Sequence, residues 1–556
     1  MTEQRPLALL ERYQLSRINV GVPATVCLTA LLRLGSAESS QFEATLARAV
    51  TVLVQRYPLL RCRVTGARTT TPRWTPLDSS SSPDRFIGTA AAELAFASGN
   101  NDDAAAAGVI SAAFKYMSRV DPEEGPLWRV WALEDGEDSA RRRVVYATNH
   151  ILTDGTGARN LFADLLALLH PNNSSVLPPA DDAELPPPME SVLNLSLSFV
   201  DMAQVVWSEI LAPNLLPRFL RPAEPPIFHR APLVPPHAQE TAVPRTFTLP
   251  ASLVGDLKAA AKSNRVMTLH PVLYIAGLAA IEAHKSPPES VIVGSTPASV
   301  RALAPTSLPP ATGNYVYEVK VSHPAAALLP FWSECRSYAE KLADPATRLH
   351  GLKGIGQLSL VPDGPIPPSP PPSSSSSGGP TTKYDAWMTE RAQKAEAFET
   401  TFEVSNLGVL PPTGWEGGGG DSAGKESAGD HQLVKLAWAQ TAMTGTIFAI
   451  NVRPDFFLGF SILPFSLSPL SHRMARLTDS ILRARHGGDR HTSVQIWQPI
   501  AIRGGDLSFT LTYRARTVEE SLVDRIWSSY EDILRRVAAG RVPASATFAQ
   551  LAAAAA

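Results

Sequence analysis

The most informative segment of the chain reads VVYATNHILTDG, from Val144 to Gly155. Its apolar residues, with those just before them, predict a strand over 142–148 that leads directly into His150. Asp154 follows four residues later, and the Asp-Gly pair favours a tight turn into a helix predicted over 157–169. Because the end of a strand is a rigid platform, the sequence predicts that His150 is presented in a fixed direction.

Two interpretations of His150 are open from the residues alone. With an ordinary pKa of ~6.5, a histidine is largely neutral at pH 7 and can accept a proton, which suits a general base. A single histidine near a strand end is more often a hydrogen-bonded polar residue, and a His and an Asp four residues apart often occur by chance. The combination of strand, HxxxDG and apolar helix is more specific than the spacing, and it favours a functional histidine.

Working outward from this segment, the chain divides into two blocks that both mix strands and helices. The first block covers about 8–170, and the second begins at Arg245. Two proline-rich stretches, 171–188 and 213–244, lie between the blocks and frame a helix predicted over 189–211. This order of elements predicts a mixed α/β fold.

The elements are predicted from apolar periodicity and from turn and proline signals. The other predicted elements of the first block are strands over 24–32, 59–64 and 127–133, and a helix over 42–57. In the second block the predicted strands cover 245–249, 290–296, 315–321, 401–405, 433–440, 445–452, 459–463, 493–499 and 507–513. The predicted helices there cover 251–263, 269–284, 331–342, 469–485 and 518–537, the last opening with a capping box at Thr517–Glu520.

The composition restricts the classes of function. The 556 residues include 50 Lys and Arg against 52 Asp and Glu, so the chain lacks the basic surplus of a nucleic-acid-binding protein. The three cysteines are scattered and no histidine pair at ligand spacing stands near acids, so we expect neither disulfides nor a metal site. The chain shows no secretory signal, no apolar run of membrane length and no C-terminal Ser-Lys-Leu-type signal, which predicts a cytoplasmic protein without a transmembrane segment.

The motif and its surroundings resemble a known group of enzymes. His150–Gly155 resembles the HxxxDG signature of the CoA-dependent acyltransferase superfamily, which contains chloramphenicol acetyltransferase, peptide-synthetase condensation domains and fungal alcohol acetyltransferases. Glu403–Gly408 resembles the Ser-Asn-Leu-Gly segment of the alcohol-acetyltransferase-like members. Further similar segments, in the expected order, are Pro126–Val130, Pro297–Arg301, Gly313–Tyr315, Trp438–Gln440 and Gly505–Thr510.

Departures from the pattern narrow the resemblance to a free-standing, fungal-type member. Asn149 stands where condensation domains often carry a second His. The chain has no Asp-Phe-Gly-Trp-Gly motif of the plant BAHD branch, and no adenylation or carrier domain flanks the two blocks. The proline-rich layout with inserts is similar to that of fungal glycolipid acyltransferases of the mannosylerythritol-lipid type.

The resemblance implies two chloramphenicol-acetyltransferase-like halves with a tunnel between them. Residues 1–185 would form the N-terminal half with the HxxxDG motif, 186–244 a helix and the proline-rich crossover, and 245–556 the C-terminal half. Two inserts in the last half, 362–382 and 414–430, are predicted to be disordered because of their low complexity. Acyl-CoA as co-substrate and a hydroxyl-bearing acceptor would meet in the tunnel. We expect a monomer with no bound cofactor and no metal.

The resemblance also implies roles for individual residues. His150 would be the general base that takes the hydroxyl proton, without a covalent intermediate. Asp154 would be structural, with Arg301 as the candidate partner, and Gly155 would permit the turn. Candidates for an oxyanion or tunnel role are Asn406, Gln440, Thr441 and Thr444. Arg301 could equally be a solvated surface residue, and the four polar candidates could equally make structural hydrogen bonds.

The expected activity is transfer of an acetyl or longer acyl group from CoA to a hydroxyl. The acceptor stays open among alcohols, secondary metabolites and the sugar hydroxyls of glycolipids. The alternative is a non-catalytic module of the same fold that binds acyl groups or a partner, and hydrolysis of acyl-CoA is a further possibility. The intact His150 and Gly155 favour catalysis over a binding module.

Overall fold

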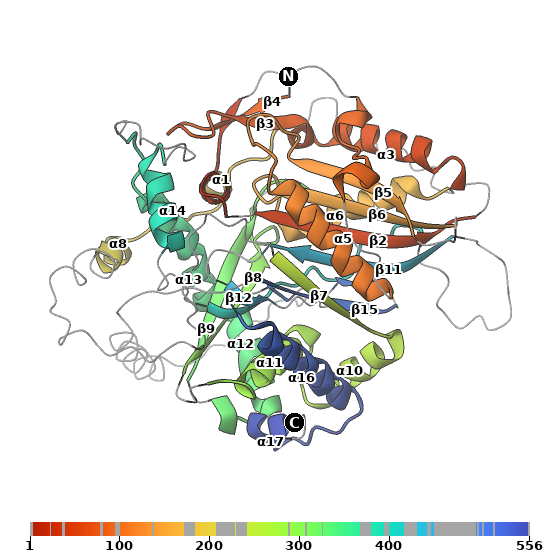
Figure 1. The fold of residues 1–556 in the computed structure, drawn as a ribbon. Coiled ribbons are helices and arrows are strands. Elements are labelled where there is room, and N and C mark those ends of the chain that lie inside the picture. Colours follow the sequence, from red (N-terminus) through yellow and green to blue (C-terminus); the bar gives the residue numbers. More distant parts are fainter. Residues whose placement is uncertain are drawn as a thin grey trace.

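The protein is described from a computed structural model with side chains. The described residues form two parts, one above the other in Figure 1, and each part is built on a sheet with helices packed against it. The described residues are 4–22, 24–35, 39–77, 82–94, 101–135, 138, 140–171, 184–206, 228, 242–286, 288, 290–305, 308–324, 326–366, 380–393, 400–415, 431–441, 446–449, 496–497, 500–502, 505–514 and 518–553.

A four-stranded antiparallel sheet with the order β11-β2-β6-β5 is the centre of the N-terminal part. Along β6, Val144 and Tyr146 pack toward one helical layer, whereas Val145 and Ala147 pack toward another. The strands are β2 (Thr25–Arg33), β5 (Trp128–Glu134), β6 (Arg141–Asn149) and β11 (Gln432–Gln440). Helices α3 (Phe42–Arg56) and α6 (Gly155–Leu169) cover the first face, and α5 (Asp102–Met117) covers the second. Burial of both faces explains why β2 is apolar over most of its length and why β6 has four consecutive apolar residues from Val144 to Ala147.

Strand β11 is remote in sequence from the sheet that it completes. It pairs antiparallel with β2, with Trp438 opposite Leu28 and Gln440 opposite Val26. Figure 1 shows it in blue beside the red and orange strands of the N-terminal part. The sequence predicts this strand but not its partner, because pairing between distant segments leaves no local signal.

A mixed sheet of eight strands is the centre of the C-terminal part. Its order is β14-β15-β13-β12-β10-β8-β9, and β7 also pairs with β15. β10 is parallel to β8, β12 and β13, whereas the β7–β15 and β8–β9 pairs are antiparallel. The strands are β7 (Ala242–Leu249), β8 (Ile292–Ser299), β9 (Val316–His323), β10 (Thr400–Val404), β12 (Thr446–Ala449), β13 (Ile496–Trp497), β14 (Ile500–Ala501) and β15 (Leu507–Arg514).

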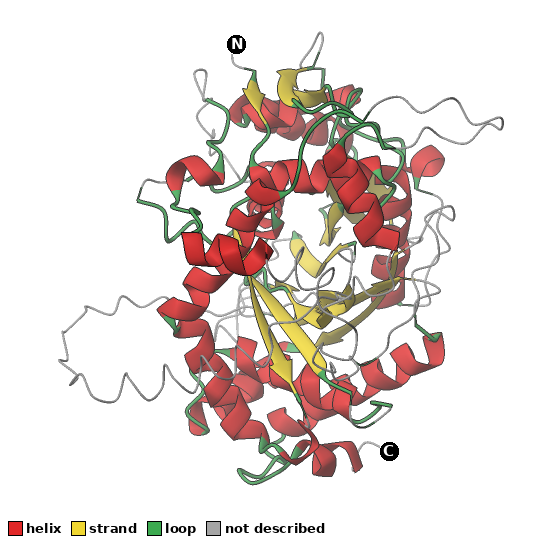
Figure 2. Cartoon of the chain, turned by 90° about the vertical axis from the view of Figure 1, so that its left-hand side faces the viewer, coloured by secondary structure: helices red, strands yellow, loops and turns green. Residues whose placement is uncertain are grey.

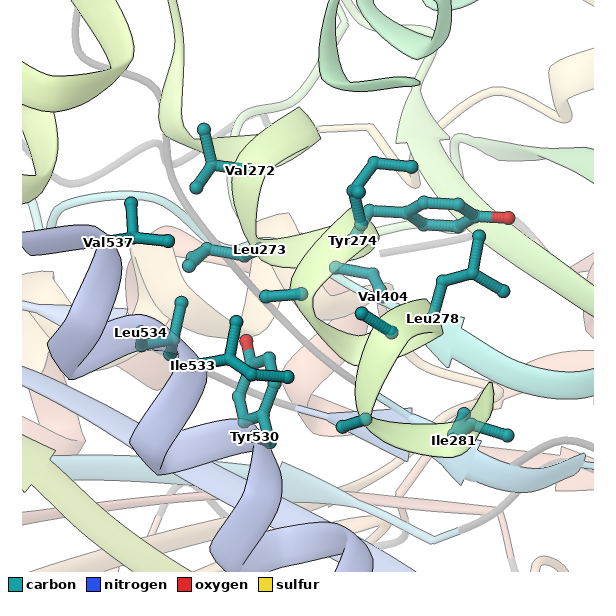
Figure 3. Close-up of a cluster of buried hydrophobic side chains, with 14 of the residues drawn as sticks. Val272, Leu273, Tyr274, Leu278, Ile281, Val404, Tyr530, Ile533, Leu534 and Val537 are labelled. Carbon is teal, nitrogen blue, oxygen red and sulfur yellow. The ribbon is translucent and has the colours of Figure 1, made fainter. Parts of the chain in front are cut away.

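Helices cover one face of this second sheet. α11 is buried on nearly every side, as its almost uninterrupted apolar sequence requires, whereas α16 buries one stripe. In Figure 3, Ile533, Leu534 and Val537 of α16 face α11. The helices of this layer are α10 (Ala251–Ser263), α11 (Leu269–Glu282), α12 (Phe331–Ala343), α16 (Glu520–Ala538) and α17 (Phe548–Ala553).

The remaining elements surround these two parts. β1 (Arg5–Pro6), β4 (Arg73–Pro76) and β3 (Cys62–Thr65) form a small third sheet. The remaining helices are α1 (Leu9–Asn19), α4 (Ala90–Glu93), α7 (Met189–Val192), α8 (Phe199–Val206), α13 (Pro345–Gly356) and α14 (Lys383–Gln393), with short 3-10 turns at Pro58–Arg61, Pro83–Arg85, Ala326–Leu328 and Gln357–Leu360. Figure 2 looks onto the side of α8, α13 and α14 and shows helices as an outer layer in front of the strands.

The mixed α/β class is confirmed, and three predicted elements are wrong in detail. The strand expected over 59–64 begins with a 3-10 turn, and only Cys62–Thr65 pairs. The single helix expected over 189–211 is two helices, because Ser198 and Asp201 cap a new start at α8 through mutual side-chain to backbone bonds of 2.9 and 3.1 Å. The capping box predicted at Thr517–Glu520 is also wrong. It would require the helix to begin at Val518, but α16 begins at Glu520 and its N-cap is Glu519.

Four helices of the structure are not predicted from the sequence: α1, α5, α13 and α14. For α5 the reason is its richness in alanine, which leaves little contrast in the apolar periodicity. β12 and β13 are the described parts of the strands expected over 445–452 and 493–499. The strand at 459–463, the helix at 469–485, and most of the proline-rich crossover and of both inserts lie outside the described residues.

Candidate active site

His150 lies where β6 leaves the sheet. Its backbone N–H donates to the carbonyl oxygen of Ala24 (2.6 Å). The side-chain Oδ1 of Asn149 accepts from the N–H of Ile151 (3.1 Å), a local turn that ends the strand. The His150 side chain is buried, with 7% of its surface exposed. The end of the strand therefore fixes the position of the imidazole.

Asn314, just before β9, determines where the proton lies on His150. Its Nδ2 donates to the carbonyl oxygens of His150 (2.9 Å) and Ile151 (3.0 Å). With the amide assigned in this way, Oδ1 can only accept, and it lies 3.2 Å from Nδ1 of His150. Nδ1 therefore carries the hydrogen, and Nε2 keeps the lone pair that can take a proton.

The surroundings of His150 favour the neutral imidazole. Burial lowers its pKa below the ordinary value of 6.5, and the guanidinium of Arg17 acts in the same direction. Arg17 is itself completely buried near the end of α1. The carbonyl group of His150, Asp154 and Asn314 act in the opposite direction without cancelling the shift in pKa. A neutral imidazole at pH 7 is the form that can act as a general base.

Asp154 is held by hydrogen bonds from three sides. Its carboxylate accepts from the N–H of Gly157 (2.8 Å) as the N-cap of α6, and from the N–H of Tyr315 (2.8 Å). Nη1 of Arg301 lies 2.9 and 2.7 Å from the two carboxylate oxygens. The pairing of Asp154 with Arg301 is thus present, and these bonds make the carboxylate a structural anchor for the turn after His150.

Arg301 reaches across to this turn from the C-terminal half. It also donates to the carbonyl oxygens of Pro309 (3.1 Å) and Gly313 (3.3 Å). Its guanidinium lies over the ring of Tyr315, 5.0 Å from the ring centroid. These contacts exclude the alternative of a solvated surface arginine, and they join the HxxxD turn to the second half of the molecule.

Gly155 is needed for a close approach between segments. A Cβ at this position would lie 2.8 Å from Cδ2 of Leu407 and 3.5 Å from the ring of Trp438. The carbonyl oxygen of Leu407 also accepts a hydrogen bond from Arg159 of α6. Gly155 does not have a positive φ, so its role is to let α6 begin against the Ser-Asn-Leu-Gly loop and β11.

The four polar candidates occupy different places. Oδ1 of Asn406 accepts from the N–H of Gly408 (2.9 Å), a contact that does not use the side-chain NH2 group. Gln440 donates to Oε1 of Glu403 (3.1 Å). The hydroxyl of Thr441 accepts from the N–H of Thr25 (3.0 Å), where β11 meets β2. Thr444 lies outside the described residues. The three described candidates all have structural contacts.

Three further residues at or near the site, Asn314, Arg17 and Glu403, are not predicted from the sequence as site residues. Burial raises the pKa of Glu403 well above its usual range, while the positive charge of Arg17 opposes this shift. One sequence signal could have identified these residues. Each is a polar or charged residue in or beside a segment that is buried in the fold. Such residues are retained in cores only with partners, so they indicate a buried polar site.

Other chemistries find no support among the described residues. No group of three or more His, Cys, Asp or Glu side chains in the described ranges could hold a metal ion. All three cysteines are buried, and burial raises the pKa of the Cys62 thiol to about 12, which disfavours a thiolate nucleophile. Within the part of the chain that is described, no helix combines the length and the apolar character that a membrane span requires.

Comparisons with known proteins point to one class. The family model for alcohol acetyltransferase matches residues 97–351, a range that includes His150, Asp154, Arg301 and Asn314. No curated protein sequence matches the chain.

Solved structures share the fold over nearly the whole chain. The TRI3 trichothecene 15-O-acetyltransferase from Fusarium sporotrichioides has a TM-score of 0.58 at 13% identity, with 96% of this chain and 95% of that chain covered. The condensation domain of the monacolin K polyketide synthase MokA has a TM-score of 0.53 at 10% identity, with coverages of 97% and 98%. Polyketide synthase associated protein 5 from Mycobacterium tuberculosis has a TM-score of 0.52 at 10% identity, with coverages of 96% and 100%.

The resemblance predicted from the HxxxDG and Ser-Asn-Leu-Gly segments is therefore confirmed. The chain matches the alcohol acetyltransferase model over a range that contains the site, and it has the two-halved fold of the acetyltransferases and condensation domains. The family-model match supports an acyltransferase activity on small molecules, and the likeness to the solved structures shows the fold.

Proposed function

We propose that the chain is an acyl-CoA-dependent O-acyltransferase with His150 as its general base. The observation that carries this proposal is the geometry of the imidazole. Asn314 holds the hydrogen on Nδ1, burial and Arg17 favour the neutral form, and Nε2 keeps its lone pair. Direct transfer from an activated thioester to a hydroxyl requires a base that accepts a proton at neutral pH.

The proposed reaction has two steps. Nε2 takes the proton of the acceptor hydroxyl as the alkoxide oxygen attacks the thioester carbonyl, which forms a tetrahedral oxyanion. The oxyanion then collapses, the carbon–sulfur bond breaks, and the imidazolium returns its proton to the CoA thiolate. General-base catalysis of this kind contributes about 10²–10⁴ in rate. The side-chain NH2 of Asn406 is our candidate donor to the oxyanion.

The contacts across the two halves support the substrate arrangement that we propose. His150 comes from the N-terminal half, and Asn314 and Arg301, which hold it and its turn, come from the C-terminal half. We propose that acyl-CoA and the acceptor reach His150 from opposite ends of a tunnel between the halves. The proposed acceptor is a hydroxyl of an alcohol, a secondary metabolite or a glycolipid sugar.

Release of free thiol from acetyl-CoA and from longer acyl-CoAs, with and without a panel of alcohols, tests the proposal. We expect thiol release that depends on the alcohol, and a loss of at least about 10²-fold in the His150→Ala variant without a change in thermal stability. His284→Ala, which removes a partly exposed histidine near the end of α11, is the matched control and should keep full activity.

Three outcomes would contradict the proposal. Wild-type turnover in a folded His150→Ala variant would remove His150 from the mechanism. Thiol release that is the same without any alcohol would indicate hydrolysis, and acyl-CoA binding without release would indicate the non-catalytic alternative.

A further inference from the structure

Two buried histidines lie between the second sheet and the helices that cover it. His270 of α11 and His323 at the end of β9 are only 5% and 7% exposed. Nε2 of His270 lies 3.0 Å from Oγ1 of Thr296 on β8, and Nε2 of His323 lies 3.0 Å from the hydroxyl oxygen of Tyr274 on α11. The proposed mechanism uses neither imidazole, so their burial has another consequence for the protein.

Two stacked tyrosines connect the histidines. The rings of Tyr274 and of Tyr338 on α12 are parallel, with centroids 3.7 Å apart, on the side of α11 opposite α16 (Figure 3). The hydroxyl of Tyr338 lies 2.7 Å from Oγ1 of Thr296, the partner of His270. We call these five residues the histidine network: His270, Thr296, Tyr338, Tyr274 and His323.

The network favours neutral imidazoles. The partner of each imidazole is a hydroxyl group, which does not compensate a positive charge as a carboxylate does. A protonated imidazole donates from both nitrogens, but Nδ1 of His270 is buried and has no hydrogen-bond partner among the described residues. Protonation would therefore place an uncompensated charge and an unsatisfied N–H group in the core, and both are costly.

The strands beside the network contribute no negative charge to it. β8 contains no charged residue. On β10 the ring of Phe402 packs against Tyr274, so the neighbouring Glu403 points to the opposite face of the sheet. On β9, Glu318 and Lys320 are an odd number of positions from His323, so they also lie on the opposite face.

The helices contribute no negative charge either. The only charged residue of α11, Glu282, is the last of the helix. α12 carries the buried thiol of Cys335 and, further along, Lys341, whose charge disfavours a protonated His323. No carboxylate of a described residue acts on either imidazole. Burial lowers the pKa of His270 and that of His323 from the ordinary value of 6.5 to about 3.

We infer that the histidine network is an acid-sensitive element, in which protonation of His270 and His323 drives unfolding of the C-terminal half. β8 ends two residues before Arg301, and β9 begins two residues after Asn314. Loss of the packing behind these strands would therefore release both residues that support the turn at His150. The effect on stability does not rest on the proposed acyl transfer, whereas the loss of activity does.

The two protonation states determine the direction and the size of the pH dependence. In the unfolded chain both imidazoles are solvated and bind protons below about pH 6.5, whereas in the folded chain they stay neutral down to about pH 3. Their contribution to stability is therefore complete above pH 6.5 and is lost progressively as the pH falls from 6.5 to 3. Within this range each histidine changes the folding equilibrium constant about tenfold per pH unit, and the pair about 100-fold.

Urea unfolding of the full chain between about pH 7.5 and 4.5 tests the inference. The His270→Gln/His323→Gln variant is compared with the wild type at each pH, so that the carboxylates common to both cancel in the ratio of their equilibrium constants. Glutamine keeps an amide that can bond to the hydroxyl partners. Per pH unit below 6, we expect the double variant to lose about 100-fold less in this constant than the wild type, and each single variant about tenfold less.

Tyr338→Phe is the matched control. It removes a hydroxyl of the same network but no group that titrates between pH 4.5 and 7.5, so its loss of stability should be the same at every pH. Thiol release should disappear with the folded state, so the double variant should stay active at lower pH than the wild type. If the proposed acyl transfer fails, the urea measurement still decides the inference.

An identical pH dependence in the wild type and the double variant would overturn the inference. NMR of the imidazole carbons provides a second measurement that does not require the glutamine variants to fold. The signals of His270 and His323, identified as those that move in Thr296→Val and Tyr274→Phe, should keep the positions of neutral imidazole down to about pH 5 in the wild type. Signals that titrate near pH 6.5 in the folded protein would overturn the inference as well.

Discussion

At the scale of single residues, a buried amide determines what His150 can do. Asn314 uses both hydrogens of its amide on backbone carbonyls, so its oxygen must receive a hydrogen from Nδ1 of His150. The same contacts close the turn that carries the imidazole. Asn314 is thus a positioning residue, which acts on the reaction through His150.

The Asn314→Asp variant tests this role through the pH profile. A carboxylate can still accept from Nδ1 but would favour the imidazolium, so the pKa of His150 should rise from its lowered value. Because the base must be neutral, the acidic limb of kcat/KM should move to higher pH, while the wild type stays active below pH 6.5. An unchanged acidic limb with a lower melting temperature would show that Asn314 only supports the fold.

A second prediction at the scale of single residues concerns the ion pair between Asp154 and Arg301. Asp154→Asn and Arg301→Ala should each destabilise the protein by about 3–5 kcal/mol, because each leaves a buried partner uncompensated. The double variant should be no worse than either single one, as measured by denaturant unfolding. As a control, the exposed pair of Arg535 and Glu531 on α16 should contribute at most about 1 kcal/mol. Simple additivity at the Asp154–Arg301 pair would contradict the coupling.

At the scale of elements, the first turn of α6 packs directly against residues of the C-terminal half. A Cβ on Gly157 would lie 2.0 Å from Oγ1 of Thr153, 2.9 Å from the carbonyl oxygen of Ala311 and 3.1 Å from Nη2 of Arg301. The turn after His150 can therefore sit against the C-terminal half only because position 157 in the first turn of α6 has no side chain.

Gly157→Ala and Gly255→Ala form a matched pair that tests this packing. Both glycines lie in helices, but a Cβ at Gly255 of α10 would meet nothing within 4 Å. Gly255→Ala should stabilise the protein by about 0.5–1 kcal/mol, whereas Gly157→Ala should destabilise it by about 1–3 kcal/mol and lower activity. Thermal unfolding and the thiol-release assay measure both. Equal effects of the two variants would mean that the helix start does not support the site.

At the scale of elements, local features could be predicted from the sequence, whereas contacts between distant segments could not. The strand into His150 and the turn at Asp154 are local patterns, and apolar periodicity and turn chemistry are sufficient to find them. The pairing of Asp154 with Arg301 comes from the family resemblance, since 147 positions separate them. The role of Asn314 and the pairing of β11 with β2 depend on contacts between distant segments, and nothing in the neighbouring sequence encodes such contacts.

At the scale of the whole molecule, the two halves are not independent. β11 comes from the C-terminal half, yet it completes the N-terminal sheet and places Leu433, Leu436 and Trp438 in that sheet's apolar cluster. The site is divided in the same way, because His150 depends on Asn314 and Asp154 depends on Arg301. Neither the N-terminal core nor the candidate base is complete without the second half.

Separate expression of fragments 1–241 and 242–556 tests this dependence. Fragment 1–241 lacks β11, so β2 becomes an exposed edge and the cluster loses the buried Trp438. We expect this fragment alone to aggregate or to unfold without cooperativity, and the two fragments expressed together to form a complex with thiol-release activity. Fusing residues 431–441 to fragment 1–241 through a Gly/Ser linker should improve its solubility, since it restores the missing strand but not Asn314 or Arg301. This fused fragment should remain inactive. A soluble fragment 1–241 that unfolds cooperatively on its own would contradict the dependence.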